Sequence, residues 1–149
     1  MTPVDPDYAG RVRTSFSQQR AMTLLGTEII EVLPGMTEIG LPFREELTQQ
    51  DGFVHAGIIT AIVDSACGYA ALSLMPSGVG VLAVEFKVNL LNPAVGRRFL
   101  ARGQVVKPGR TIMVCTGEVV AERWDGTQQT VALMQATMMV VRGRTTVLA

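Results

Sequence analysis

Hydrophobic and polar residues follow two different patterns along the chain. The segment DGFVHAGIITAIVDSACGYAA, residues 51–71, is apolar on nearly every face when it is drawn as a helix from about Ala56. After a break at MPSGVG, the next segment alternates with a period of two. One face would carry Val84, Phe86, Val88 and Leu90, and the other Ala83, Glu85, Lys87 and Asn89. These patterns predict a central helix over residues 56–75, followed by a strand.

The residues before the central helix predict one helix and two strands. DPDYAGRVRTSFSQQRAMTLLG predicts an N-terminal helix within residues 1–26, which Asp5 caps, Pro6 opens and Gly26 ends. Val12 would lie on its inner face, with the arginines outside. TEIIEVLPGMTEIGLPFR predicts two strands joined by a turn at LPGM.

Three further strands complete the predicted sheet. RRFLARGQVVK and TIMVCTGEVVAER are joined by KPGR, and the pair Asp125-Gly126 favours a hairpin into TVALMQATMMVVRG. Strands that follow one another in hairpins form a mostly antiparallel sheet. A long sheet and one all-round apolar helix can bury each other if the sheet wraps the helix, which predicts an α+β fold in a single domain, residues 1–149. The apolar surface that the sheet leaves exposed must be covered by a second layer, which indicates that the protein associates with itself.

Composition narrows the classes of function. Of the 149 residues, 48% are hydrophobic and 17% are charged, as in a packed globular chain. The 13 basic and 13 acidic side chains cancel, which argues against a nucleic-acid binder or a polybasic membrane anchor. Asp64 and Ser65 interrupt the one apolar run that approaches the length of a membrane span. The N-terminus lacks the features of a signal peptide, so we expect a cytoplasmic protein.

The sequence offers few residues for metal binding or thiol catalysis. Cys67 and Cys115 lie inside apolar runs, so we expect buried free thiols in a reducing compartment. Two cysteines and the only histidine, His55, offer no metal-ligand spacing, and we expect neither a metal nor another cofactor. No G-x-S-x-G elbow is present, and Cys67 is too distant from His55 to be activated by it, which rejects Ser and Cys hydrolase chemistry.

Asp64 is the one unambiguous charge in the most apolar segment. An isolated buried carboxylate costs on the order of several kcal/mol, and burial raises its pKa, as at many functional sites. The structural alternative is that Asp64 faces water or bonds a backbone amide. The free amides near Ala56 and Gly57 at the helix start suit a developing oxyanion. Gly57 and Asp64 are roughly 10 Å apart along the axis, so a shared site needs two helices related by a two-fold axis.

The segment GFVHAGIITAIVD resembles the helix-start signature of hot-dog-fold acyl-CoA thioesterases of the phenylacetate-degradation (PaaI-like) group, usually H-G-G followed by seven residues ending in Asp. The match continues through VEFKVNLLNPAVG and GQVVKPGRT and covers nearly the whole chain after the first helix. The resemblance implies an antiparallel sheet around a central helix and thioester hydrolysis at the interface of a homodimer. It also implies that such dimers often form a homotetramer.

The resemblance further implies a role for each residue of the signature. The catalytic carboxylate would be Asp64, as nucleophile or as general base on water. The oxyanion donor would be the amide of Ala56, with Gly57 following. His55 lies half a revolution round the helix from Asp64, so within one helix they form no dyad. We therefore interpret His55 as a cap or a hydrogen-bonding support rather than a base.

The sequence departs from the family pattern at three positions. Ala56 replaces the usual first glycine, Gln49 stands where relatives often have Asn, and Ala83 stands where some have a hydroxyl. Ala83 and Val84 would still contact the substrate from the third strand. These departures predict either a modest activity or a replacement of the missing polar groups by Gln49, Gln50 or Ser65.

The segment VKPGR has two interpretations. Pro108 and Gly109 explain it fully as a hairpin turn. Alternatively, Lys107, Gly109 and Arg110 form a binding site for the phosphates of coenzyme A. The sequence therefore predicts an acyl-CoA thioesterase, with a non-catalytic acyl-CoA-binding hot-dog module or a hot-dog dehydratase acting on acyl carrier protein as alternatives.

Overall fold

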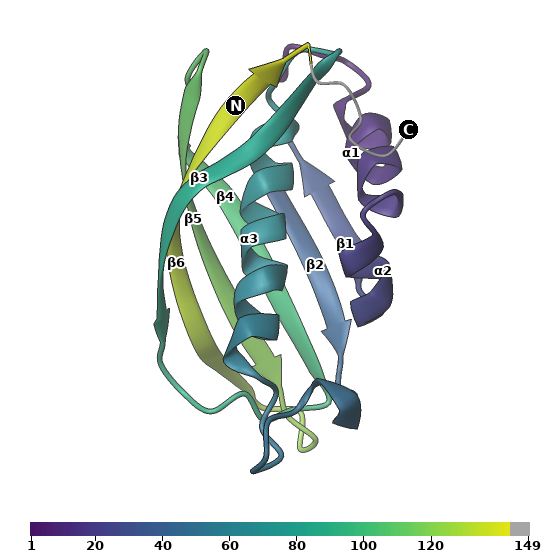
Figure 1. Ribbon diagram of the computed structural model, residues 1–149, viewed down its shortest axis with the longest axis vertical. Coiled ribbons are helices and arrows are strands. Elements are labelled where there is room, and N and C mark those ends of the chain that lie inside the picture. The colour runs from purple at the N-terminus through teal and green to yellow at the C-terminus, as the bar shows by residue number, and fades with distance from the viewer. Residues whose placement is uncertain (144–149) are drawn as a thin grey trace.

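The computed structural model describes residues 1–143, which form one hydrophobic core. A curved sheet wraps one central helix, and two short helices lie beyond the sheet's first strand (Figure 1). In chain order the elements are α1 (Tyr8–Ser17), α2 (Arg20–Leu25), β1 (Glu28–Leu33), β2 (Met36–Pro42), the 3-10 helix η1 (Glu45–Leu47), α3 (Ala56–Leu72), β3 (Val79–Leu90), β4 (Arg98–Lys107), β5 (Ile112–Glu122) and β6 (Gln128–Arg142).

The six strands form one antiparallel sheet in the order β1-β2-β4-β5-β6-β3. This confirms the predicted α+β hot-dog architecture and the turns at LPGM and at Asp125-Gly126, where Gly35 and Gly126 have φ angles of 82° and 85°. The simple hairpin succession was wrong at one point. β3 pairs with β6 rather than with its successor β4, and β4 pairs with β2. β3 therefore forms one edge of the sheet, where it crosses in front of β4 to β6 (Figure 1).

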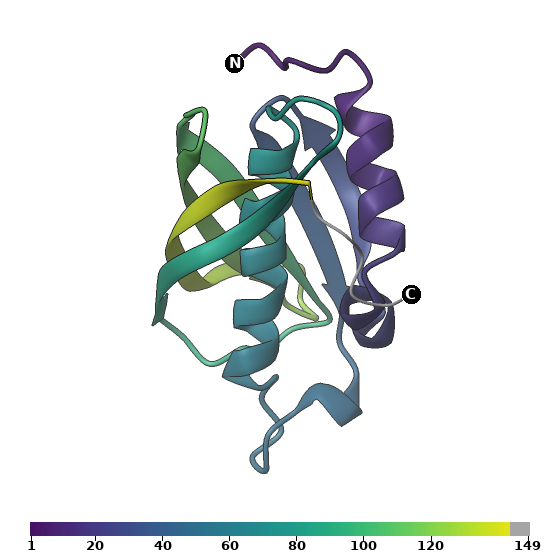
Figure 2. The ribbon, with the colours of Figure 1, turned by 45° about the horizontal axis from the view of Figure 1, so that its top comes forward.

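Helix α3 is buried because the sheet approaches it closely. The helix packs against β2, β3, β4, β5 and β6, and Figure 2 shows the sheet curving around it. Gly103 on β4 and Gly117 on β5 permit this contact: a Cβ at Gly103 would lie 2.3 Å from the carbonyl carbon of Ala66, and one at Gly117 would lie 2.5 Å from Val63. The helix ends at Leu72, three residues before the predicted end. No helix within residues 1–143 is long and apolar enough to span a membrane.

The N-terminal segment differs from the single predicted helix over residues 1–26. The chain forms α1 and α2, with a break at Gln18 and Gln19. The predicted stop at Gly26 is confirmed: Gly26 caps the end of α2 in a left-handed conformation, with φ at 73°. Asp7, rather than Asp5, occupies the N-cap position of α1. The Asp5 carboxylate instead accepts a hydrogen bond from the amide of Asp7 at 3.0 Å with one oxygen and pairs with Arg11 through the other.

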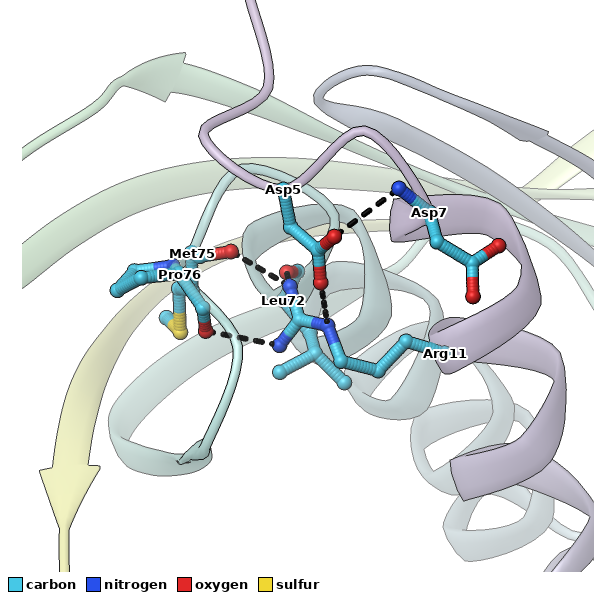
Figure 3. Close-up of polar contacts among 6 residues, drawn as sticks. All are labelled: Asp5, Asp7, Arg11, Leu72, Met75 and Pro76. Carbon is cyan, nitrogen blue, oxygen red and sulfur yellow. Dashed lines mark hydrogen bonds and ion pairs between the residues drawn. The ribbon is translucent and has the colours of Figure 1, made fainter.

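Arg11 joins α1 to the end of α3, so the expectation that the arginines of the first helix lie outside was wrong for this residue. Its guanidinium donates to the carbonyls of Leu72 at 3.0 Å, Met75 at 2.5 Å and Pro76 at 3.1 Å, and pairs with Asp5 at 3.0 Å (Figure 3). The last carbonyls of a helix have no partner within the helix. Arg11 supplies a partner for Leu72, the last residue of α3, and for the two carbonyls of the segment that follows, and it thereby joins α1 to the end of α3.

The alternation predicted for the third strand is interrupted by a β-bulge. Ala83 pairs with Met138 and Glu85 with Thr137, which leaves Val84 as an extra residue in β3. A bulge exchanges the two faces of a strand. Val79 and Val81 therefore contact the core before the bulge, and Val88 does so after it. As an edge strand, β3 also carries exposed apolar side chains, with exposed fractions of 41% for Leu82, 55% for Val84, 44% for Phe86 and 53% for Leu90.

Candidate active site

The start of α3 carries one free backbone donor. His55 caps the helix: its Nδ1 accepts a hydrogen bond from the amide of Gly57 at 2.9 Å. Its carbonyl accepts from the amides of Ile58 and Ile59. The amide of Ala56 has no acceptor among residues 1–143 and lies at the positive end of the helix dipole. His55 is thus the predicted cap, and the amide left for a ligand is that of Ala56.

The expectation that Gly57 also offers a free amide was wrong. Its N–H is committed to His55, and a Cβ at this position would lie 3.0 Å from the His55 ring nitrogen. Glycine therefore leaves room for the imidazole to fold back onto the helix start. The role of Gly57 is to permit the cap, while Ala56 presents the donor.

A cavity of about 350 Å³, which we call the Ala56 cavity, opens beside this donor. Gln49 and Ala56 both line it, so the structure brings together two of the predicted site residues. The Gln49 side-chain oxygen accepts a hydrogen bond from the amide of Asp51, which leaves its NH₂ group for a ligand. Gln50 is exposed and contacts Asp51 instead. The other walls come from the loop before α3, from α3, from the end of β3 with the loop that follows it, and from β6. They contain Phe53, Val54, Ile59, Leu90, Leu91, Asn92, Pro93, Ala94 and Val131.

Asp64 faces a second and larger cavity of about 600 Å³, which we call the Asp64 cavity. Its Oδ1 is buried and has no hydrogen-bond partner within the described part of the chain. Desolvation by burial raises the pKa of this carboxyl above its ordinary value. Ala83 and Ser65 line the same cavity. In the structural alternative, a backbone amide would donate a hydrogen bond to Asp64. Oδ1 accepts no such bond within residues 1–143.

A polar group in the Asp64 cavity escaped the sequence analysis. Gln19 accepts a hydrogen bond from the Tyr69 hydroxyl at 3.2 Å and donates to the Ser65 hydroxyl at 3.4 Å. The break between α1 and α2 places Gln19 there. The only signal in the sequence was the polar run SQQ inside an otherwise amphipathic segment. Ser65, one of the residues predicted to supply a polar group, is the acceptor of the Gln19 hydrogen bond.

Ala56 and Asp64 do not meet within one chain. They are eight residues apart on α3, about 12 Å along the axis, and they open into different cavities. The β3 strand connects the two regions: Leu82 and Ala83 line the Asp64 cavity, and Leu90 lines the Ala56 cavity. Within one chain, the free Ala56 amide and the buried Asp64 carboxylate therefore lie at two separate cavities.

Comparison with known proteins places this arrangement in a family. A family model described as the thioesterase superfamily matches residues 51–124. A candidate esterase of Halobacterium salinarum is 30% identical over 150 aligned positions, covering 95% of this chain and 99% of that protein. A candidate esterase of Saccharolobus solfataricus is 31% identical over 90 residues, which span 60% of this chain and 64% of that protein.

Solved structures agree with the sequence matches. A thioesterase family protein from Silicibacter pomeroyi superposes with a TM-score of 0.89 at 53% identity, covering 91% of this chain and 99% of that one. The chain belongs to the thioesterase superfamily. The E. coli PaaI protein, at 20% identity, shares the fold with a TM-score of 0.82, covering 94% of this chain and 97% of that one. The resemblance to PaaI-like hot-dog proteins is confirmed, and the family assigns the chain to the hydrolases that act on thioester bonds.

Two cysteines of this superfamily member lie in the core and take no part in either cavity. Cys67 and Cys115 are free and buried, as predicted, and the Cys115 thiol donates to the Cys67 carbonyl at 3.7 Å. Burial raises the pKa of Cys115 to about 12 and that of Cys67 above the ordinary range. Both thiols are protonated at neutral pH and are poor nucleophiles. Within residues 1–143, no three His, Cys, Asp or Glu side chains gather as metal ligands do.

Lys107 ends β4, and Gly109 and Arg110 follow it in the β4–β5 connection, at the opposite end of α3 from Ala56. Lys107 and Arg110 are exposed. Gly109 and Arg110 line a cavity with Leu74 and Met75 and do not enter the Asp64 cavity. Val84 is exposed at the bulge of β3. Within one chain, these substrate-binding candidates are therefore separate from the free amide of Ala56.

Proposed function

We propose that this thioesterase hydrolyses acyl-CoA to a free carboxylic acid and coenzyme A at a site shared by two copies of the chain. The observation that carries the proposal is the position of two groups on one helix that have no hydrogen-bond partner within residues 1–143, Oδ1 of Asp64 and the amide of Ala56. The two residues line different cavities about two turns apart. Each is half of a hydrolytic site, and an antiparallel second helix supplies the missing half to both.

The exposed edge of β3 supports a homodimer with this geometry. An edge strand of 12 residues with exposed apolar side chains is a template for pairing with another strand. If two β3 strands pair antiparallel about a two-fold axis near Phe86, Leu82 of one copy lies beside Leu90 of the other. This brings the Asp64 cavity of one subunit next to the Ala56 cavity of its partner. The homotetramer implied by the family resemblance stays a prediction.

The proposed chemistry uses each group for what its surroundings favour. The thioester carbonyl accepts a hydrogen bond from the Ala56 amide, which stabilises the negative charge that develops on its oxygen. Asp64 of the partner subunit then attacks the carbonyl carbon or removes a proton from an attacking water. Either route breaks the carbon–sulfur bond and adds the elements of water to give acid and thiol. Burial makes the carboxylate a stronger base, because it disfavours the charged form.

Release of free thiol from acyl-CoA tests this function directly. We expect a thiol reagent to report steady turnover with at least one member of a panel of short, medium and aryl acyl-CoAs. A non-catalytic acyl-CoA-binding module would bind the substrate without releasing thiol. A dehydratase would change the acyl chain of a carrier-bound substrate and leave its thioester intact. Binding without thiol release across the whole panel would therefore contradict the proposal.

The exposed cations of the β4–β5 connection are proposed to contact the phosphates of coenzyme A. In the antiparallel dimer, the end of α3 near this connection adjoins the partner's Ala56 end. Neutralising Lys107 and Arg110 together should raise the KM for acyl-CoA several-fold and leave that for acyl-pantetheine unchanged, because only acyl-CoA carries the phosphates.

A matched control for this variant removes two exposed charges elsewhere. The double variant of Arg13 and Arg20, both exposed on the N-terminal helices, makes the same change in net charge. It should leave the KM for both substrates unchanged. If the Lys107 and Arg110 variant raises both KM values equally, the segment VKPGR is only a turn.

A further inference from the structure

The β5–β6 hairpin presents an aromatic ring that the fold does not bury. Trp124 is the only tryptophan of the chain, and 70% of its surface is exposed. It contacts Phe43 edge to face, with ring centroids 6.2 Å apart and planes inclined by 75°. This contact holds the indole in place and leaves most of it accessible. Large exposed apolar side chains that gather in a patch mark binding surfaces.

Trp124 is part of a hollow of about 450 Å³, which we call the Trp124 hollow. It adjoins the Ala56 cavity, because Phe53 and Pro93 line both. A ligand whose carbonyl lies at the Ala56 amide can therefore extend past Phe53 and Pro93 to the indole. The remaining lining residues are Val95, Arg123, Asp125 and Gln129.

The charged groups of the Trp124 hollow have separate tasks. The Arg123 guanidinium donates a hydrogen bond to the side-chain oxygen of Gln129, which holds the cation at the hollow. The Asp125 carboxylate accepts hydrogen bonds from the amide and the hydroxyl of Thr127, at 2.9 and 2.6 Å. Asp125 thus closes the hairpin turn, and Arg123 is the group of the hollow that suits an anion.

We propose that the Trp124 hollow binds the nucleotide end of acyl-CoA, with adenine stacked on the indole and a phosphate at Arg123. This inference rests on the proposed function and adds the location of the nucleotide. The pantetheine arm leads from the thioester at Ala56 along Phe53 and Pro93. Every nucleobase presents a flat face that an indole can stack on, and a neighbouring arginine adds attraction for the phosphates. The nucleotide then lies on the subunit that supplies the oxyanion donor.

Tryptophan fluorescence tests the proposal without any catalytic readout. Because Trp124 is the only tryptophan, the emission of the full chain reports this hollow alone. Titration with adenosine 3′,5′-bisphosphate should quench or shift the emission in a saturable manner, and titration with pantetheine should not. In Arg123→Gln, the same titration should saturate at a several-fold higher concentration. If the bisphosphate inhibits thioester hydrolysis without altering the emission, the nucleotide binds elsewhere and the proposal is overturned.

Kinetics of two variants separate stacking from structural support. Trp124→Ala should raise the KM for acyl-CoA by roughly 5- to 150-fold, the range that corresponds to loss of one base–aromatic stack. Trp124→Phe keeps a ring and should retain most of the affinity. Acyl-pantetheine should show the same KM with all three proteins. An equal rise for both substrates would mean that Trp124 only supports the hairpin. Thiol release without any bisphosphate binding would refute the nucleotide site and leave the thioesterase proposal intact.

Discussion

Replacing Asp64 by Asn should lower the rate of thioester hydrolysis by at least ~10²-fold, the usual scale for loss of acid–base help. The amide keeps the shape of the side chain in the Asp64 cavity but can neither attack a carbonyl nor accept a proton from water. The variant should fold at least as well as the wild type, because it removes a charge whose Oδ1 is buried without a partner among residues 1–143. Thiol release and thermal unfolding measure the two effects.

The control for this variant is Asp51→Asn, which neutralises an exposed carboxylate outside both cavities. It should keep wild-type activity. Near-normal turnover in Asp64→Asn would end the catalytic assignment of Asp64.

Because the pKa of Asp64 is raised, its catalytic role predicts a specific pH dependence of activity and of stability. The active form is the carboxylate, so kcat/KM should fall in acid with a midpoint above the ordinary value of 3.8. For stability the sign is opposite. A carboxyl whose pKa is raised by folding stabilises the native state below its unfolded pKa, and this contribution is lost as the pH rises through the folded pKa. The stability of Asp64→Asn relative to wild type should therefore increase from acid to neutral pH.

Local patterns predicted the elements of the fold better than their partners. The apolar run from residue 56, the alternating strands and the turns at Pro34-Gly35 and Asp125-Gly126 all appear in the structure. Period-two alternation, however, only requires that one face of a strand is buried and does not specify the neighbouring strand. The crossover of β3 to β6 and the bulge at Val84 depend on how the sheet closes around α3, which no local pattern encodes.

The candidate site likewise contains residues that the sequence reveals and residues that it does not. Asp64 stands out in the sequence because a charge is costly in an apolar helix, and His55 because its position suits a cap. Gln19 and Arg11 do not stand out, since polar residues are ordinary on a surface helix. Their contacts reach Ser65 and the end of α3, across 46 and 61 or more residues of chain. The rotamer of His55, which decides that Ala56 rather than Gly57 keeps a free amide, is likewise fixed only by the folded geometry.

Two inactive variants should restore activity when they share a dimer, provided that Asp64 serves the neighbouring subunit. Ala56→Pro removes the free amide at the first helical position, where proline is tolerated. The structure favours this choice, because the Ala56 amide has no acceptor within residues 1–143 and His55 has a ψ angle of 136°, which suits the residue before a proline. Asp64→Ala removes the carboxylate. Each variant alone should be nearly inactive.

When the two variants are refolded together in equal amounts, about half of the two-fold dimers should be hybrids. In a hybrid, the Ala56 amide of the Asp64→Ala chain meets the Asp64 carboxylate of the Ala56→Pro chain, so one site is intact and the other carries both lesions. Activity should then recover to roughly a quarter of the wild-type value by this subunit arithmetic. If each site lay within one chain, every site in the hybrid would carry one lesion and mixing would restore nothing. If native mass spectrometry confirms the hybrids and mixing still restores no activity, the shared site is ruled out. The buried Asp64 carboxylate then needs a structural rather than a catalytic explanation.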